Sequence, residues 1–140
     1  MTRVNLSVNM ISTETLHAGA AFAIRVVVRD GRNAVVEFLR DDLQQTERAK
    51  VMALLEYVAE HGPPLNEEKF RHEGNGIYAL KTSAVRLYGF FDGQRRIVLT
   101  HGFKKHARGG KKVQAREREH AERMRAMLLA ERASGGRDER

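Results

Sequence analysis

The sequence of 140 residues contains no cysteine, and this absence excludes both a disulfide framework and thiolate metal sites such as zinc fingers and ribbons. Its six histidines are scattered along the chain, so we expect no histidine-rich metal site and predict no metal. A chain without cysteine also fits the reducing environment of the cytosol.

Long apolar runs are missing as well. No uninterrupted run approaches the ~20 residues of a membrane span, and residues 1–20 place polar side chains where a signal peptide needs an apolar core. These polar residues are Asn5, Asn9, Glu14 and His17. We therefore expect a soluble, cytoplasmic protein with no membrane partner.

Several common functional motifs are absent too. The chain has no Walker loop, no Gly-x-Gly-x-x-Gly, no nucleophile elbow and no His-Glu-x-x-His motif. The nucleotide-binding proteins and hydrolases that depend on these motifs are poor fits, and we expect no cofactor.

The positive charge of the chain is concentrated near its C-terminus. The net charge is +7, and residues 1–100 hold 13 Lys and Arg against 12 Asp and Glu, whereas residues 101–140 hold 12 against 6. Such an excess favours a polyanion such as nucleic acid, or an acidic partner protein, over a requirement of the fold. A solvated tail is the alternative.

The length of the chain suffices for one ordinary core and makes two independent domains unlikely. We predict a single domain over residues 21–131. Residues 1–20 show no sustained apolar period and are expected to form an extension before the folded unit. Residues 132–140 are expected to form a disordered tail.

The first half of the domain predicts a strand and two helices. An apolar period of two over residues 22–29 is typical of a β-strand, and Asn33 can cap a short helix after it. A longer helix follows, in which apolar residues stand at i, i+3, i+4 and i+7: Val51, Leu54, Leu55 and Val58. Gly62 and two prolines would end it, and helices so close along the chain predict an antiparallel helical hairpin.

The second half predicts three strands and a helix. The strands cover residues 77–81, 85–91 and 96–101 and are joined by short turns. A charged helix follows over residues 113–131, with an apolar side formed by Ala121, Met124 and Leu128. The predicted fold is α+β: an N-terminal strand, then a helical hairpin and a C-terminal helix that all pack on one face of a small antiparallel sheet.

Isolated cations lie on the predicted strands. An even turn between the first two strands of the meander would place Lys81 directly opposite Arg86. Opposed like charges cost stability, so such a pair is easiest to explain if an anion lies between them. The alternative is that both side chains diverge into water.

The position of His101 depends on the next turn. A turn of four residues would place His101 opposite Arg86, with Ile97 and Leu99 on the same face, whereas one added residue would turn the last strand over. A histidine with an ordinary pKa near 6.5 could serve as acid or base next to a phosphate. A plain hydrogen-bonding residue is the alternative.

A dense basic segment follows the last strand. Its glycines, Gly102, Gly109 and Gly110, would let the backbone approach a ligand closely. The cations expected to contact phosphate are Lys104, Lys105, Arg108, Lys111 and Lys112. Three aromatic residues, Tyr78, Tyr88 and Phe103, could stack on bases, although core packing is the more common use and is favoured for Tyr88.

The succession GIYALK, VRLYGFF and DGQRRIVLTHGFKKH, followed by a charged helix, resembles the RelE/ParE toxin superfamily, particularly its HigB-type and phage-derived members. The resemblance spans about residues 21–130 and includes VVEFLRDD and ALLEYVAEHGPP upstream, and HGFKK is its most specific element. It implies a RelE-like fold and a type II toxin. It further implies a ribonuclease that cleaves messenger RNA on the ribosome without metal, until a cognate antitoxin, a small helix-turn-helix protein, neutralises it.

Carried over residue by residue, the resemblance implies a catalytic set of Lys81, Arg86 and His101. Arg86 would stabilise the transition state with Lys81 beside it, and His101 would carry the proton; Lys104 and Lys105 would anchor the RNA backbone. The chain departs from the strongest ribonuclease patterns, because no convincing carboxylate is apparent near these cations and the C-terminal segment has no tyrosine. Some superfamily members poison DNA gyrase instead. A non-catalytic basic module that binds nucleic acid or an acidic protein is therefore the alternative function.

Overall fold

The computed structural model of the chain describes residues 10–105 and 110–135. Its elements follow in the order β1 (Ile11–Ala18), β2 (Ala23–Arg29), β3 (Arg32–Asn33), α1 (Ala34–Asp41), α2 (Gln45–His61), β4 (Phe70–Gly74), β5 (Ile77–Lys81), β6 (Val85–Phe91), β7 (Arg96–Lys104) and α3 (Gly110–Ala133). The α+β class is confirmed. The predicted strands at 77–81 and 85–91 have the predicted bounds.

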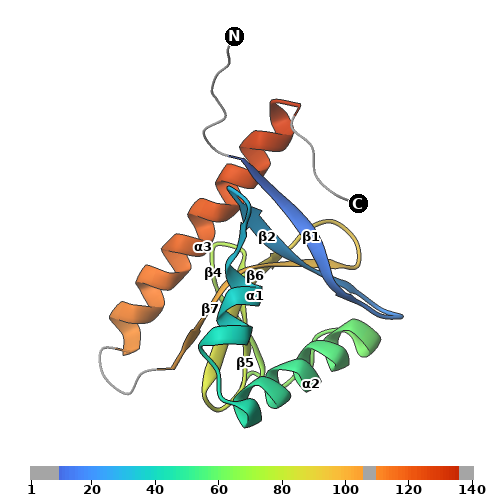
Figure 1. Ribbon diagram of the computed structural model, residues 1–140, viewed down its shortest axis with the longest axis vertical. Coiled ribbons are helices and arrows are strands. Elements are labelled where there is room, and N and C mark those ends of the chain that lie inside the picture. The colour runs from blue at the N-terminus through green and yellow to red at the C-terminus, as the bar shows by residue number, and fades with distance from the viewer. Residues whose placement is uncertain (1–9, 106–109, 136–140) are drawn as a thin grey trace.

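The strands form one mixed sheet (Figure 1). Its order is β1-β2-β7-β6-β5-β4, with β3 paired to β2. Neighbours run antiparallel except β2 and β7, which are parallel. The prediction of a purely antiparallel sheet is therefore wrong, because β2 inserts beside the last strand of the meander and extends the sheet beyond it.

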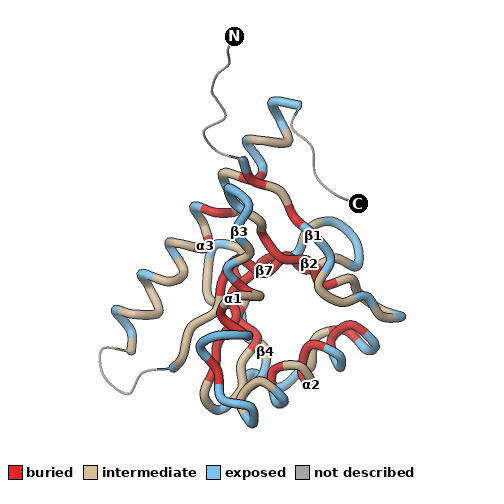
Figure 2. Tube along the Cα trace, viewed as in Figure 1, coloured by how far each residue is buried: buried red, intermediate tan, exposed pale blue. Residues whose placement is uncertain are grey.

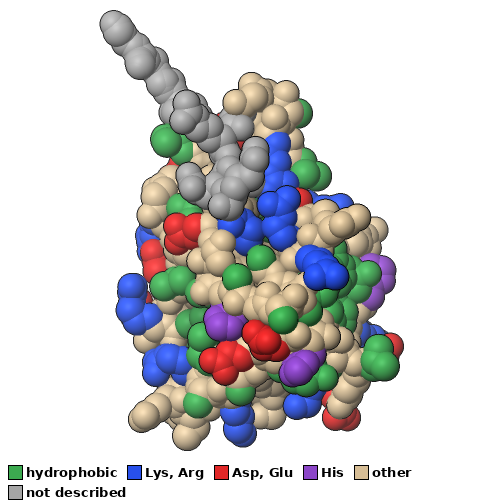
Figure 3. Space-filling view, turned by 90° about the vertical axis from the view of Figure 1, so that its right-hand side faces the viewer, with side chains coloured by type: hydrophobic (Ala, Val, Ile, Leu, Met, Phe, Trp, Pro, Cys, Tyr) green, Lys and Arg blue, Asp and Glu red, His purple; other side chains and the backbone are tan. Residues whose placement is uncertain are grey.

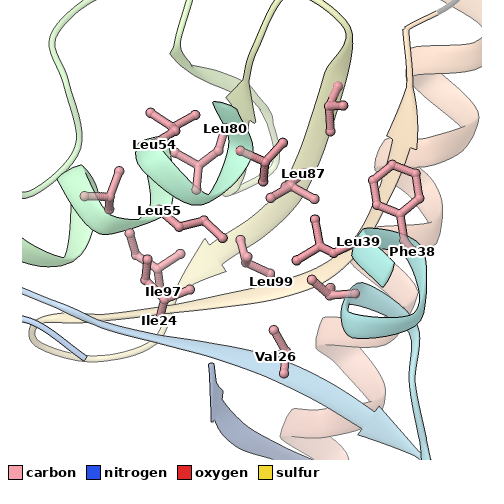
Figure 4. Close-up of a cluster of buried hydrophobic side chains, with 14 of the residues drawn as sticks. Ile24, Val26, Phe38, Leu39, Leu54, Leu55, Leu80, Leu87, Ile97 and Leu99 are labelled. Atoms are coloured by element: carbon pink, nitrogen blue, oxygen red, sulfur yellow. The ribbon is translucent and has the colours of Figure 1, made fainter. Parts of the chain in front are cut away.

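Helices cover both faces of this sheet (Figure 1). One core lies between the sheet and the pair α1 and α2, and Figure 4 shows leucines of α2 pointing at strand residues such as Leu80 and Ile97. A second core lies under α3 and contains Ala121, Met124 and Leu128 with apolar residues of the strands. The expectation that the helices share one face is wrong, and Figure 2 shows the buried strands of the central sheet between the two layers.

The structure also adds two edge strands that the sequence did not predict. β1 lies in the second half of the segment expected to be an extension, and β4 lies in a segment expected to be a connection. β1 is held to β2 partly by polar contacts, since Arg25 donates to Thr13 Oγ1 at 2.8 Å and to Thr15 Oγ1 at 2.6 Å. Polar pairing of this kind leaves no apolar alternation for sequence reading to detect.

The helix ends follow local rules. The backbone N–H of Val36 donates to Asn33 Oδ1 at 3.0 Å, which confirms the predicted cap of α1. α2 ends at Gly62, whose φ of 86° is one that glycine adopts without strain. The two helices are steeply inclined to each other (Figure 1), unlike the predicted antiparallel hairpin. Within the described residues, no helix is both long and apolar enough to span a membrane.

Candidate functional site

The register of β5 and β6 brings two cations together. Lys81 lies directly opposite Arg86, as predicted. Side chains alternate along a strand, so Lys81 follows Ile77 and Ala79 to the face of the sheet that α3 covers, and Arg86 precedes Tyr88 on that face. The two cations therefore lie side by side at the end of the α3 face.

The register of β6 and β7 differs from the prediction. Five residues, 92–96, separate the paired residues Phe91 and Ile97, and Phe103 instead of His101 lies opposite Arg86. The longer turn sends Ile97 and Leu99 into the other core. The predicted pairing of His101 with Arg86 and the shared face with Ile97 and Leu99 are both wrong.

A β-bulge returns the end of β7 to the α3 face. The pairing passes from Gly89 with Leu99 to Tyr88 with His101, so Thr100 is the extra residue. His101 and Phe103 therefore share the face of Arg86 after all. The bulge compensates for the odd residue in the turn.

Arg86 is buried, and the part of the chain that the structure describes offers its side chain no polar partner. Its residue exposure is 7%, and among the described residues it has neither a hydrogen bond nor a salt bridge. Buried charges are normally paired, because removing an ion from water is costly. The guanidinium of Arg86 is thus a strong donor available to an anionic ligand.

Lys81 lies in the same electrostatic environment. Burial lowers the pKa of its ammonium group, and the charges of Arg86, Arg71 and Lys105 lower it further, whereas Glu73 opposes them. A phosphate between Lys81 and Arg86 would relieve the repulsion of their like charges. This pair is the centre of the candidate site.

Lys104 does not join this pair. Its Nζ forms an ion pair with Glu47 Oε1 of α2 at 3.0 Å, so its side chain points to the opposite face of the sheet. Contact of Lys104 with phosphate stays a prediction, but its side chain does not lie on the face of Lys81 and Arg86. Strand alternation explains why Lys104 lies on this face, because Gly102, two residues earlier, lies against Phe38 of α1 on the same face.

His101 is held firmly by its neighbours. Its Nε2 lies 2.8 Å from Glu117 Oε1 of α3, and its Nδ1 lies 2.9 Å from Thr100 Oγ1. Burial, together with the charge of His120, lowers the pKa of His101 to about 4, although the hydrogen bond to Glu117 opposes this change. The ring is therefore neutral at pH 7 and both nitrogens are engaged, which suits a positioning role better than free proton transfer.

Three of the remaining predicted cations lie just after β7 or at the start of α3. Lys105 is exposed beyond β7, and Lys111 and Lys112 are exposed in the first turn of α3. Figure 1 shows this end of α3 to the left of β7. Arg108 lies outside the described residues. Contact of these lysines with RNA stays a prediction.

A comparison with protein families completes this description. The model of the family described as phage-derived protein Gp49-like (DUF891) matches residues 37–126. The chain belongs to the Gp49-like family. This is a RelE/ParE-like toxin family of toxin–antitoxin systems. A comparison with curated proteins found no match.

The matched region of this Gp49-like chain contains the whole candidate site. It runs from α1 into the second half of α3 and includes both Lys81 and Arg86. The strands β1 and β2 lie before it. The family match therefore covers the meander that positions the cations.

Two carboxylates of the Gp49-like chain were missed by the sequence analysis. Glu117 bonds to His101, and Glu73 acts on the pKa values of Lys81 and Tyr88. The expectation that no carboxylate lies near the cations is wrong. Glu117 stands one helical turn before Ala121, so extending the apolar side of α3 backwards would have found it. Glu73 belongs to β4, which has no apolar alternation.

The aromatic residues divide between the two faces. Tyr88 is fully buried and contacts Phe103 edge-on, with ring centroids 5.1 Å apart, so it belongs to the core as favoured. Tyr78 lies on the other face, stacked on Phe70 at 5.1 Å. Of the three predicted stacking residues, the half-buried Phe103 lies directly opposite Arg86.

Charge on another side of the molecule is mixed. Figure 3 shows the side that lies on the right in Figure 1, towards the β1–β2 hairpin, where acidic, basic, histidine and apolar side chains alternate. A mixed surface of this kind offers little to a polyanion. The α3 face with Lys81 and Arg86 is the better candidate for binding RNA.

Proposed function

We propose that this Gp49-like protein is the toxin of a type II toxin–antitoxin system, of the HigB type, and that it cleaves messenger RNA as an endoribonuclease. The family is toxin-like. The observation that carries the enzymatic proposal is the buried Arg86, unpaired among the described residues and directly opposite Lys81. A fold seldom retains such a pair unless an anion is its normal partner.

The chemistry follows from this pair. The ribose 2′-oxygen attacks the adjacent phosphorus, and the phosphorus–5′-oxygen bond breaks. The planar guanidinium of Arg86 suits two oxygens of the pentacoordinate phosphate, whose negative charge grows in the transition state. Lys81 adds positive charge beside Arg86. The lowered pKa of Lys81 makes its ammonium group a suitable proton donor to the leaving 5′-oxygen.

The partners we propose are messenger RNA on the ribosome and a small helix-turn-helix antitoxin that blocks the site. The exposed lysines Lys105, Lys111 and Lys112 would contact the RNA backbone and give a strongly salt-dependent affinity. Expression of the wild-type chain should arrest growth. Coexpression of the small open reading frame that neighbours its gene should restore growth.

The catalytic proposal is tested by Arg86→Ala and Arg86→Lys. Loss of transition-state stabilisation should lower the single-turnover cleavage rate constant at least about 100-fold for Arg86→Ala, and Arg86→Lys should recover little because lysine lacks the fork. Arg123→Ala, an exposed position on α3, is the matched control and should cleave normally. Messenger cleavage at the wild-type rate by Arg86→Ala would refute the assignment.

A non-catalytic module that binds nucleic acid or an acidic protein is the second candidate. The observation in its favour is that both ring nitrogens of His101 are occupied, which removes the histidine expected to carry a proton. Normal growth on expression, with salt-dependent RNA binding and no cleavage, would favour this candidate.

A further inference from the structure

Two buried polar atoms near the cation pair have no hydrogen-bond partner. Within the described residues these are Glu73 Oε2 and Tyr88 Oη. Buried polar groups are normally bonded, and a group left unbonded costs about 1–3 kcal/mol. Both atoms belong to one neighbourhood, because Glu73 is the largest charged influence on the pKa of Tyr88 after burial itself.

The sheet explains how Glu73 reaches this neighbourhood. The pairing of β4 with β5 shifts between His72 and Gly74, so Glu73 is the extra residue of a bulge. Ala79 of β5 pairs with both Arg71 of β4 and Tyr88 of β6. A small alanine between the two outer strands leaves room for side chains from β4 and β6 to approach each other above it.

Charges in this neighbourhood lie close together without pairing. Glu73, Arg71 and Arg86 all influence the pKa of Lys81, yet no salt bridge within 4.0 Å joins any of the four in the described part of the chain. Elsewhere the same chain does pair such groups, as Arg132 with Asp92 at 2.9 Å shows. A carboxylate beside cations, all of them unpaired among the described residues, suits a ligand that offers hydroxyl donors and phosphate oxygens together.

We propose that Glu73 is the catalytic base of the site and takes the proton of the ribose 2′-hydroxyl. This inference rests on the proposed function and assigns the base, a role to which His101 is poorly suited because Glu117 and Thr100 occupy both of its ring nitrogens. A ribonucleotide offers the hydroxyl to the carboxylate and the phosphate to Arg86 and Lys81. A deoxyribonucleotide lacks the hydroxyl and cannot react.

The step balances without a cofactor. The 2′-hydroxyl proton passes to Glu73 while the 2′-oxygen forms its bond to phosphorus. The bond from phosphorus to the 5′-oxygen breaks, and that oxygen receives a proton from Lys81. The products are a 2′,3′-cyclic phosphate and a 5′-hydroxyl end, and solvent later exchanges the protons on Glu73 and Lys81.

Glu73→Gln tests the proposal, because it removes the base and keeps the shape of the side chain. Positioned bases contribute about 10²- to 10⁴-fold, so the single-turnover cleavage rate constant should fall at least about 100-fold. Affinity for the same RNA with a 2′-deoxy scissile nucleotide should change less than about threefold, because ground-state binding is retained. Glu68→Gln, at an exposed position just before β4, is the matched control.

A pH profile separates a base from a structural residue. The wild-type rate should rise with pH along an acidic limb that reports ionisation of the base, and Glu73→Gln should lose that limb. Glu73→Asp, which keeps the carboxylate, should retain the limb at a lower rate. Thermal melting of each variant confirms that the fold is intact.

The outcomes distinguish this inference from the proposed function. Glu73→Gln cleaving within about tenfold of wild type, while Arg86→Ala is inactive, would overturn the role of Glu73 and leave the endoribonuclease standing. A wild-type chain that produces no cyclic phosphate ends would overturn both. Loss of cleavage by Glu73→Gln, with unchanged affinity for the deoxy RNA and no acidic limb, is the result expected.

Discussion

Acidification should destabilise the fold through His101. In the folded state its pKa is lowered to about 4 from the ordinary 6.5, first by burial and then by the charge of His120, against the hydrogen bond and charge of Glu117. In the unfolded chain the ring titrates near 6.5. Between these values the unfolded state binds more protons than the folded state, so stability rises with pH and is lost as the pH falls from 6.5 towards 4.

The size of this effect follows from the two values. The interval from 6.5 to about 4 corresponds to a loss on the order of 3 kcal/mol, at 1.36 kcal/mol for each pH unit. His101 is only 8% exposed, so solvent screens little of it. The free energy of unfolding of a small domain is about 5–15 kcal/mol, so the loss on acidification is a large part of the total stability.

Two other groups, His120 and Glu47, also make the stability of the fold depend on pH. The pKa of His120 is also lowered, by burial and then by Arg123. Its contribution to stability is therefore also lost as the pH falls below the ordinary histidine pKa of about 6.5. The pKa of Glu47 is lowered, first by its hydrogen bond to the backbone of Gln44 and then by that to Lys104. Its contribution is lost only below its ordinary 4.5, at the acidic end of the range.

Urea unfolding at pH 7, 6, 5 and 4.5 measures the effect. The free energy of unfolding of wild type should fall over this range, and His101→Asn should remove most of the slope while His120→Asn removes a smaller part. His61→Asn, exposed at the end of α2, should leave the slope unchanged. If His101→Asn keeps the wild-type slope, the buried neutral histidine is not the cause and the reasoning fails.

Two further predictions concern the face of the sheet opposite the candidate site. Leu55→Ala should lower the free energy of unfolding by about 2–5 kcal/mol, because Leu55 is fully buried in the core under α2. Its rate of cleavage, measured well below the melting temperature, should stay near that of wild type. A selective loss of cleavage in a stably folded variant would contradict this. Lys104→Ala should change RNA cleavage less than about threefold, since surface ion pairs contribute little and Lys104 faces α2. A loss as large as that of Lys81→Ala would show that Lys104 belongs to the site.

The helices and strands that the sequence predicted correctly are those in which nearby residues, such as a helix cap or an alternating apolar pattern, favour the same structure as the tertiary packing. β2 alternates in β-branched residues, α1 begins at a capping Asn33, and α2 ends at Gly62. The turn between β5 and β6 has an even length, so the opposition of Lys81 and Arg86 followed from parity alone. Each of these signals depends only on residues close together in the sequence, and the structure agrees with each of them.

The elements missed are those that depend on contacts distant in sequence. β1 and β4 are edge strands with polar side chains, and only pairing with β2 and β5 makes them strands. The position of α3 on its own face depends on the second core, not on its sequence pattern. The bulge at Thr100 has no sequence signature, yet it decides which side chains accompany Arg86.

The departures from regular structure gather around the cation pair. The bulge at Thr100 turns His101 to this face, and the bulge in β4 adds Glu73. Next to them lie the opposed cations Lys81 and Arg86 and the hydroxyl of Tyr88, which forms no hydrogen bond within the described residues. Each of these features costs stability, and natural proteins tolerate such costs chiefly where function requires them. Their concentration on one end of one face therefore argues for a binding site there independently of any single residue's role.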